Sequence, residues 1–317
     1  MQRRQFLAAA AALGLTGPAL AADKAARDQQ HARDYAARRR FLATTFGDIA
    51  YVERGTGPAA VFLHGFPLSS FQWRDAIALL SPHRRCIAPD FMGLGMTRVA
   101  RGQGVTPADQ VEMLTVLLDR LGVERFDLIA NDSGGAVAQL LALRHPGRVR
   151  TMLLTNCDVE PDSPPPALLP VIEMAREGTY PDKWLVPWHA DPALCRSAEG
   201  LGGLCYSDPA QPTDAAIAQY LGPLVASPER KALVNAYTLG LDPNPLAGIE
   251  KDLRKLQTPT RIVWGVSDNI FSKDSPDYLD RVLPQSRGVR RLEKAKLFFP
   301  EEYPEVIAEE ARRLWGV

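Results

Sequence analysis

The sequence predicts an α/β fold with a mostly parallel sheet, helices on both faces and a helical lid insertion. Three observations indicate this. Short apolar segments alternate with helical ones over residues 41–157, a proline-rich stretch breaks the alternation over residues 158–245, and it returns over residues 246–317. Strands separated by helices of this length pair in parallel and are covered on both faces. We expect the insertion to lie over the carboxyl ends of the strands, as a lid on a pocket.

The core elements are predicted from apolar periodicity and from turn residues. The expected strands are residues 41–46 and 49–53, which form a hairpin, 59–63, 85–88, 126–130, 149–154, 260–264 and 289–292. The expected helices are residues 71–80, 107–121, the segment from the turn after residue 130 to about residue 144, and 303–315. Thr106 is the expected N-cap of the helix that begins at Pro107.

The composition is that of a globular protein without a charge bias. The chain has 317 residues, 46% of them hydrophobic, with 37 basic and 37 acidic side chains. It is long enough to bury a full-sized core, as one domain or as a core with an insertion. The lack of a net charge and of a basic run argues against a nucleic-acid-binding protein. The sequence does not indicate an oligomeric state.

The N-terminus has the pattern of a twin-arginine signal peptide. Arg3-Arg4 precedes an apolar stretch over residues 7–15, and Ala19-Leu20-Ala21 resembles a cleavage site. We therefore expect residues 1–22 to be removed on export to the periplasm, leaving a protein without membrane attachment. An uncleaved apolar helix is the alternative. Residues 23–40 are polar and Ala-rich, and we expect them to form an extension outside the core.

Four cysteines are too few for a disulfide framework in a chain of this size. Cys86 and Cys157 lie in or beside strand-like segments and are expected to be packing residues. Cys195 and Cys205 would be able to pair in an oxidising compartment, which the sequence leaves open. No spacing resembles a zinc site, and we predict neither a metal nor a cofactor.

Residues 127–139 combine a buried strand, a sharp turn and the start of a helix. This is the pattern of a nucleophile elbow, in which small residues flank the nucleophile at two positions on either side. With Ala130 and Gly134 as the small pair, Asp132 is the nucleophile. Gly135 then stands where the helix packs closely on the sheet. The sequence thus predicts a carboxylate at the top of the turn.

Two alternatives to this assignment remain. A shifted frame makes Ser133 the nucleophile between Asn131 and Gly135, although Asn fits the crowded first position poorly. Asp132 is also compatible with a purely structural role as the cap of the helix that follows, because Asp is common at helix starts.

Four motifs, in this order and spacing, make the chain from about residue 41 onward resemble the α/β-hydrolase superfamily. Within it, the chain resembles the branch with an aspartate nucleophile, the haloalkane dehalogenases and epoxide hydrolases. The motifs are His64-Gly65-Phe66-Pro67 with Trp73 shortly after, Pro89-Asp90 followed by Gly93-x-Gly95, Asn131-Asp132-Ser133-Gly134-Gly135, and Trp264-Gly265-Val266-Ser267-Asp268. The resemblance implies the α/β-hydrolase fold and a small apolar organic substrate.

The resemblance also implies roles for single residues. Asp132 would attack an electrophilic carbon and form an alkyl-enzyme ester that water then hydrolyses. The backbone N–H groups of Ser133 and Phe66 would hold the oxyanion of the second step. Asp268 matches the acid that orients the catalytic histidine, and Asp158 is the other place where related enzymes have that acid.

Two further residues of the motifs have less defined roles. His64 is expected to shape its loop rather than to act as a base. For Asn131 two roles stay open, orienting a substrate group or fixing the elbow.

The chain departs from the family at the histidine itself. The expected loop, residues 292–302, contains none, and alignment on the acidic, proline-containing segment Glu301–Glu305 places Leu297 at the empty position. The chain's five histidines all lie in other segments: His31, His64, His83, His145 and His189. Hydrolysis of the ester needs a base that activates water, worth roughly 10²–10⁴-fold. We consider His189, in the lid, a possible substitute base and Lys296 a poorer one because of its high ordinary pKa.

The leaving-group signature of dehalogenases is incomplete, because Ser133 and Phe66 stand where those enzymes have a tryptophan and often a side-chain amide. Phe66 fits epoxide hydrolases, whose lids supply a pair of tyrosines. The tyrosines of the insertion that qualify are Tyr180, Tyr206, Tyr220 and Tyr237.

Two hypotheses about function follow. The first is an exported hydrolase that works through Asp132 with altered base chemistry. The second is a catalytically silent relative that binds an apolar ligand or a partner in the same pocket. An esterase based on Ser133 is a third and weaker hypothesis, because it too would lack a histidine.

Overall fold

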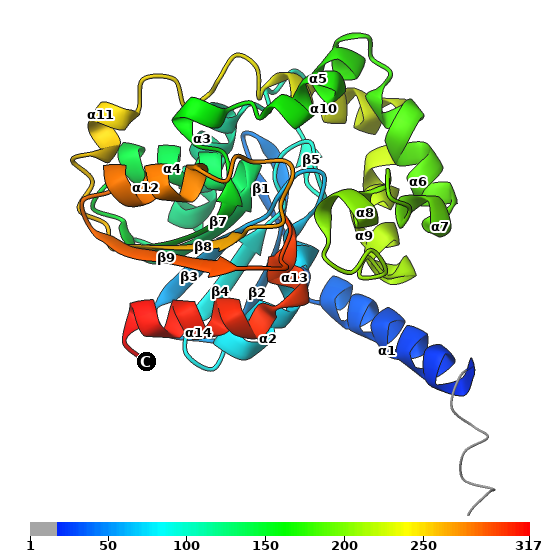
Figure 1. Ribbon diagram of the computed structural model, residues 1–317, viewed down its shortest axis with the longest axis horizontal. Coiled ribbons are helices and arrows are strands. Elements are labelled where there is room, and N and C mark those ends of the chain that lie inside the picture. Colours follow the sequence, from blue (N-terminus) through cyan, green and yellow to red (C-terminus); the bar gives the residue numbers. More distant parts are fainter. Residues whose placement is uncertain (1–17) are drawn as a thin grey trace, which may run out of the picture.

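The computed structural model describes residues 18–317, and its centre is a nine-stranded sheet with the order β1-β2-β4-β3-β6-β7-β8-β9, with β5 paired to β2 (Figure 1). The twin-arginine motif lies outside the described residues. The hairpin β1–β2 and the pair β2–β4 are antiparallel, and the neighbours from β4 to β9 are parallel. The strands are β1 Arg39–Thr44, β2 Gly47–Arg54, β3 Ala59–Leu63, β4 Arg85–Pro89, β5 Arg98–Val99, β6 Phe126–Asp132, β7 Val149–Cys157, β8 Thr260–Gly265 and β9 Ser286–Leu292.

Helices cover both faces of this sheet (Figure 1). On one face α2 Arg74–Leu80 packs against α14 Pro304–Trp315, and on the other α3 Pro107–Arg120 packs against α4 Ser133–Arg144, with α12 Ser275–Val282 beside them. Every residue of β3 and β6 is buried. A parallel strand covered on both faces reads as a continuous apolar segment, which is why these strands were predictable.

Three elements of the structure differ from the predictions. Helix α12, the two-residue strand β5 and the short helix α13 Phe299–Glu302 were not expected. Strand β9 also begins at Ser286, three residues before the predicted start. Because β9 is at the edge of the sheet and half-exposed along its length, its arginine-rich sequence gives little apolar signal.

The segment between β7 and β8 forms a group of helices beyond the carboxyl ends of the central strands (Figure 1). It contains short 3₁₀ turns at Glu160–Asp162 and Pro166–Leu168 and a π-helical turn at Pro181–Leu185. Its α-helices are α5 Leu169–Arg176, α6 Val186–Ala190, α7 Pro192–Cys195, α8 Leu201–Cys205, α9 Asp214–Val225, α10 Pro228–Leu239 and α11 Glu250–Leu253. We call the segment from Glu160 to Leu239 the lid.

The expected extension does not lie entirely outside the core. Helix α1 Pro18–Ala37 contacts lid helix α9, and its residues Ala32 and Tyr35 are buried. The Tyr35 hydroxyl donates a 2.7 Å hydrogen bond to the carbonyl oxygen of Ser70, and its ring meets the ring of Phe71 edge-on at 5.1 Å. The prediction failed because Ala32 and Tyr35 stand in a polar, Ala-rich segment whose sequence gives no clear apolar pattern.

All four cysteines are buried and free, so Cys195 and Cys205 form no disulfide in this structure. None of the described helices is both long enough and apolar enough to cross a bilayer.

Candidate functional site

Asp132 stands on a strained turn at the junction of β6 and α4. Its φ of 56° is the only positive φ of a non-glycine residue among residues 18–317, and its ψ is −135°. Such a conformation persists only where the surroundings enforce it. A Cβ at position 134 would lie 2.5 Å from the carbonyl oxygen of His64, and one at position 135 would overlap the side chain of Cys157. These close approaches explain the glycines of the elbow.

The carboxyl group of Asp132 lies between two backbone donors. Its Oδ1 accepts hydrogen bonds from the backbone N–H of Phe66, at 3.4 Å, and from the backbone N–H of Ser133. The Ser133 hydroxyl instead forms a 3.0 Å hydrogen bond with the hydroxyl of Tyr237. The predicted oxyanion donors and the predicted carboxylate are therefore together in one place.

The environment of Asp132 disfavours its charged form. Burial, and secondarily the carboxyl group of Asp158, raise the pKa of Asp132 to about 8, although the backbone N–H groups of Ser133 and Phe66 oppose the shift. Near neutral pH a substantial part of this carboxyl group is therefore protonated.

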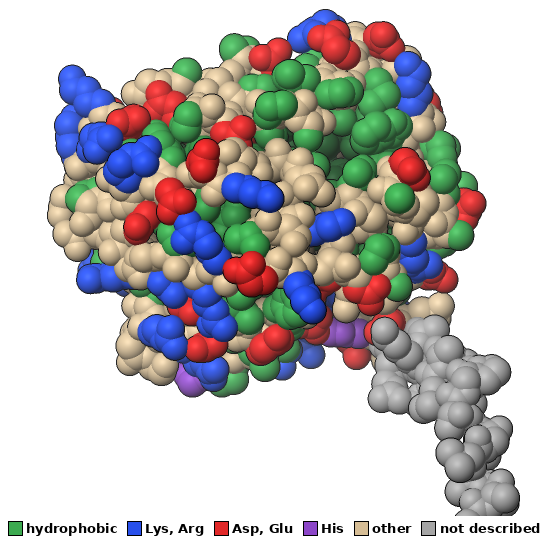
Figure 2. Space-filling view, in the orientation of Figure 1, with side chains coloured by type: hydrophobic (Ala, Val, Ile, Leu, Met, Phe, Trp, Pro, Cys, Tyr) green, Lys and Arg blue, Asp and Glu red, His purple; other side chains and the backbone are tan. Residues whose placement is uncertain are grey.

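A cavity of about 250 Å³ opens between Asp132 and the lid. Its wall is mostly apolar and aromatic, and it contains no Lys, Arg or His side chain. Figure 2 shows hydrophobic side chains gathered around a hollow in the upper part of the molecule, where α5 and α10 lie. Prominent wall residues from the lid and the core are Tyr180, Trp184, Trp188, Leu201, Phe271 and Leu297. Such a pocket suits a small apolar molecule.

His64 shapes the loop that carries Phe66, whose backbone N–H bonds to Asp132. Its Nε2 accepts a 3.0 Å hydrogen bond from the backbone N–H of Phe91, so its Nδ1 carries the proton and donates to the carbonyl oxygen of Gly65 at 2.9 Å. Burial lowers the pKa of His64, which favours this neutral form. His64 does not contribute to the cavity wall.

Gln72 and Asn131 tie three loops of the site together. Gln72 accepts from the backbone N–H of Gly65 at 3.0 Å and donates to Asn131 Oδ1 at 2.7 Å. Asn131 Nδ2 in turn donates to the carbonyl oxygen of Leu297 at 3.1 Å. Asn131 thus fixes the elbow and does not line the cavity. The sequence analysis missed Gln72, and the only signal for it was an amide between the aromatic residues Phe71 and Trp73.

Leu297 is buried and forms part of the cavity wall. Asp268, the acid expected to orient a histidine, is buried but outside the wall. Its Oδ2 accepts from Asn156 Nδ2 at 2.8 Å and its Oδ1 from the backbone N–H of Ile270 at 2.9 Å. The Asn156 amide therefore satisfies this carboxylate, whose pKa is raised by burial.

Neither of the two substitute bases considered from the sequence reaches the cavity. His189 lies on α6, where its Nε2 would be 3.3 Å from a Cβ at Gly222, and it is not a wall residue. Lys296 donates to the carbonyl oxygen of Gly203 at 2.6 Å, which binds it to the lid. The sequence could not show that α6 turns His189 away, because that depends on how the lid helices pack.

Asp158 is the second carboxyl group of the cavity wall. It follows β7, is 3% exposed, and its Oδ1 accepts a 2.8 Å hydrogen bond from the Ser163 hydroxyl. Gln139 Nε2 holds the Asp158 backbone carbonyl at 2.8 Å. Burial raises the pKa of Asp158 to about 6.

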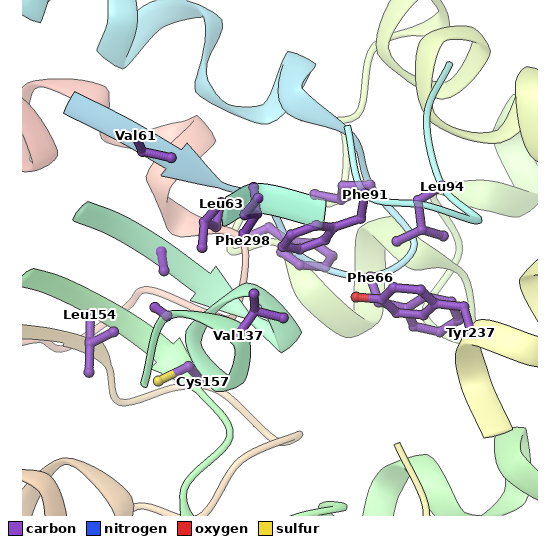
Figure 3. Close-up of a cluster of buried hydrophobic side chains, with 14 of the residues drawn as sticks. Val61, Leu63, Phe66, Phe91, Leu94, Val137, Leu154, Cys157, Tyr237 and Phe298 are labelled. Atoms are coloured by element: carbon purple, nitrogen blue, oxygen red, sulfur yellow. The ribbon is translucent and has the colours of Figure 1, made fainter. Parts of the chain in front are cut away.

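The four lid tyrosines divide into two pairs. Tyr180 lines the cavity, and Tyr237 stacks on Phe66 with ring centroids 5.5 Å apart (Figure 3). Tyr206 and Tyr220 instead donate to Glu301 Oε2 at 2.7 and 2.9 Å. Only the first pair is near Asp132.

The other oxygen of Glu301 forms a 2.7 Å ion pair with Arg74. With Tyr206 and Tyr220, this buried network holds the lid to α13 of the core. Within the described residues no cluster of His, Cys, Asp or Glu side chains is arranged to hold a metal ion.

Comparison with known proteins finds the same fold in several hydrolases. Residues 58–184 match the family model described as the alpha/beta hydrolase fold. Haloalkane dehalogenase 2 of Mycobacterium bovis is 34% identical over 117 residues, which are 37% of this chain and 41% of that protein. An uncharacterized hydrolase of Saccharomyces cerevisiae is 29% identical over 231 residues, 70% of this chain and 78% of that protein. The solved epoxide hydrolase CorEH superposes with a TM-score of 0.73 and 20% identity, over 88% of this chain and 98% of that one.

Proposed function

We propose that this protein, which has the α/β-hydrolase fold and resembles haloalkane dehalogenases and epoxide hydrolases, hydrolyses a small uncharged electrophile through a covalent ester at Asp132. The observation that carries the proposal is the placement of the Asp132 carboxyl group. Its Oδ1 accepts the backbone N–H of Ser133 in the elbow and that of Phe66 in the loop after β3, while the side chain forms part of the cavity wall. One oxygen is thus held where an oxyanion would form, and the carboxyl group faces the substrate space.

The reaction has two halves. In the first, ionised Asp132 attacks the electrophilic carbon, and the bond from that carbon to the leaving atom breaks. In the second, water attacks the ester carbonyl, and the negative charge on Oδ1 is stabilised by the N–H groups of Phe66 and Ser133. Collapse of this intermediate releases an alcohol and restores the carboxyl group.

The cavity wall favours an uncharged, apolar substrate. Its two carboxyl groups, with no cationic side chain beside them, disfavour an anion. An epoxide fits better than a haloalkane, because Phe66 has no side-chain donor for a leaving halide and the Ser133 hydroxyl is already hydrogen-bonded to Tyr237. Tyr180 in the wall supplies a hydroxyl donor for a leaving oxygen.

Intact-protein mass spectrometry tests the proposal with styrene oxide, 1-bromobutane and a p-nitrophenyl ester as probes. We expect an adduct from styrene oxide, located on the peptide that contains Asp132 and lost in Asp132→Asn. The matched variant Ser133→Ala, which keeps its backbone N–H, should retain the adduct. An adduct that survives Asp132→Asn, or one that disappears only in Ser133→Ala, contradicts the proposal.

Leu297 specifically favours a second candidate, a silent relative that binds an apolar ligand. A leucine in the histidine position removes the usual base without leaving a gap. Saturable binding of styrene oxide or of its diol in calorimetry, with neither adduct nor turnover, would support this candidate over the hydrolase.

We also propose that the chain is exported through its twin-arginine motif, as the sequence predicts. Cell fractionation of the tagged full chain should place the mature protein in the periplasm, and Arg3→Lys together with Arg4→Lys should leave it inside the cell. If the variant with both substitutions still reaches the periplasm, export does not depend on the twin-arginine motif.

A further inference from the structure

We propose that Asp158 is the base that activates water for hydrolysis of the Asp132 ester, in place of the missing imidazole. The inference rests on the proposed function, since it needs an ester to hydrolyse. It assigns a catalytic role to a residue whose position in related enzymes is that of an acid that only orients a histidine.

The first argument is position. Asp132 and Asp158 are the only Asp or Glu side chains in the cavity wall, and Leu297 faces the same space. The wall contains no His or Lys, and Asp268, His64 and His189 all lie outside it. A base must contact the water that attacks the ester, and Asp158 is the carboxyl group so placed.

The second argument is the hydrogen bonding of the buried aspartates. Asp90 accepts backbone N–H groups on both oxygens, from Ser70 and Met96, each at 2.8 Å. Asp127 has both oxygens bound by the guanidinium of Arg150, with Arg84 and Thr151 as further partners. Asp268 is likewise satisfied on both oxygens. These three are structural carboxylates, and none lines the cavity.

Asp158 differs from all three. Its Oδ1 accepts from Ser163, but no other residue in the part of the chain that the structure describes donates to its Oδ2. This oxygen is not among the fully enclosed side-chain oxygens that lack a partner. Here the side chain is 3% exposed and belongs to the cavity wall, so its free oxygen is available to a water or a substrate.

Electrostatics is consistent with this role. Besides burial, the groups that act on the Asp158 carboxyl are the Ser163 hydroxyl, its own backbone N–H and Asp162. Asp158 in turn raises the pKa of Asp132, Tyr237 and Cys157. Burial brings the pKa of Asp158 to about 6, close to the working range of a general base. Once Asp132 is esterified it is neutral and cannot place a like charge beside Asp158.

Every proton in the hydrolysis of the Asp132 ester is accounted for. Asp158 takes one proton from the water as the new bond from the water oxygen to the ester carbon forms. The tetrahedral intermediate then breaks its bond to the substrate oxygen, and Asp158 returns that proton to the departing alkoxide to give the alcohol. Asp132 is left as a carboxylic acid that loses its proton to solvent, so only water is consumed in this half-reaction.

The decisive experiment measures adduct formation and turnover separately, with styrene oxide as the probe. In Asp158→Asn we expect the Asp132 adduct to form but to persist, while steady-state diol formation falls by about 10²–10⁴-fold. The control His189→Ala, outside the cavity, should keep the turnover of the unmodified chain. Asn can still accept the Ser163 hydrogen bond, so this variant should preserve the local structure.

A rescue experiment separates a base from a structural role. Asp158→Ala should regain turnover when formate is added, because a small carboxylate can occupy the space that the variant leaves, and the same formate should not affect the unmodified chain. The Ala variant also serves if the Asn variant does not fold. Absence of formate rescue in a folded Asp158→Ala protein overturns the inference.

The remaining outcomes are distinguishable. Normal turnover in Asp158→Asn, with an adduct in the unmodified chain, overturns the role of Asp158 and leaves the proposed function standing. No adduct and no turnover in the unmodified chain overturns both.

Discussion

The two sides of the cavity are built in different ways. On the elbow side, Asp132 is held by backbone constraints: a strained φ of 56°, glycines packed against His64 and Cys157, and N–H donors from Phe66 and Ser133. On the opposite side, the position of the expected histidine is filled by the side chain of Leu297.

The difference shows which side of the cavity is fixed by the backbone. The elbow cannot change without moving the backbone of β6 and α4. On the opposite side Leu297 lines the cavity, while Asn156 satisfies Asp268 and Asn131 holds the Leu297 carbonyl. In the mechanism that we propose, the first half is thus tied to the backbone, and the second half depends on side chains that can be replaced.

The largest effect is expected for Asp132→Asn. Removing the nucleophile should lower adduct formation by on the order of 10⁴–10⁶-fold, as for other covalent catalysts. Single-turnover mass spectrometry with styrene oxide measures this. The isosteric amide keeps the elbow packed, so the melting temperature should change little. A variant that alkylates at the original rate would show that the elbow is not the reactive side.

Leu297→His should have the next largest effect, on the opposite side of the cavity. An imidazole there would supply a base, and we expect ester hydrolysis to become faster by up to about 10²-fold, the lower end of the range for a positioned base. The readout is the lifetime of the Asp132 adduct. Leu297→Gln, polar but not basic, is the control. Equal adduct lifetimes in Leu297→His and Leu297→Gln would mean that a side chain at position 297 does not reach the ester.

The rate of adduct formation should depend on pH through the raised pKa of Asp132. Because the pKa of Asp132 is raised to about 8, adduct formation should rise about tenfold per unit as pH increases toward 8 and then level off. Asp158→Asn removes one cause of the shift, so the midpoint should move to lower pH. The raised pKa of Asp132 has the opposite effect on the free energy of unfolding. Its contribution to stability is complete below the ordinary carboxyl pKa near 4 and is lost as pH rises through about 8. A flat rate profile between pH 6 and 8 would contradict the shift.

The smallest effect concerns packing at the elbow. Gly135→Ala places a Cβ into Cys157, and we expect a loss of about 1–3 kcal/mol in the free energy of unfolding, as is usual for overpacking. Gly147→Ala is the matched control, because a Cβ there meets nothing within 4 Å. Urea denaturation measures both. Equal destabilisation in the two variants would show that the tight elbow contact does not contribute.

Much of the fold was predictable because its signals are local. The apolar run over residues 59–63 became β3 with the same limits, and the N-cap expected at Thr106 begins α3 with a capping box that involves Asp109. Strand β9 and helix α12 were harder, because an edge strand and a short amphipathic helix have weak apolar patterns. The extension was misjudged because Tyr35 gains its partners, Ser70 and Phe71, only in the folded chain.

The sequence by itself determined the strand, turn and helix around Asp132 and the lack of a histidine in residues 292–302, because both are patterns along one contiguous segment. It did not determine which distant side chains share the cavity. That Asp158 and Tyr180 line it, and that His189, Asp268 and two of the lid tyrosines do not, follows from the packing of the lid on the sheet. These contacts join residues far apart in the chain, and only the tertiary structure fixes them.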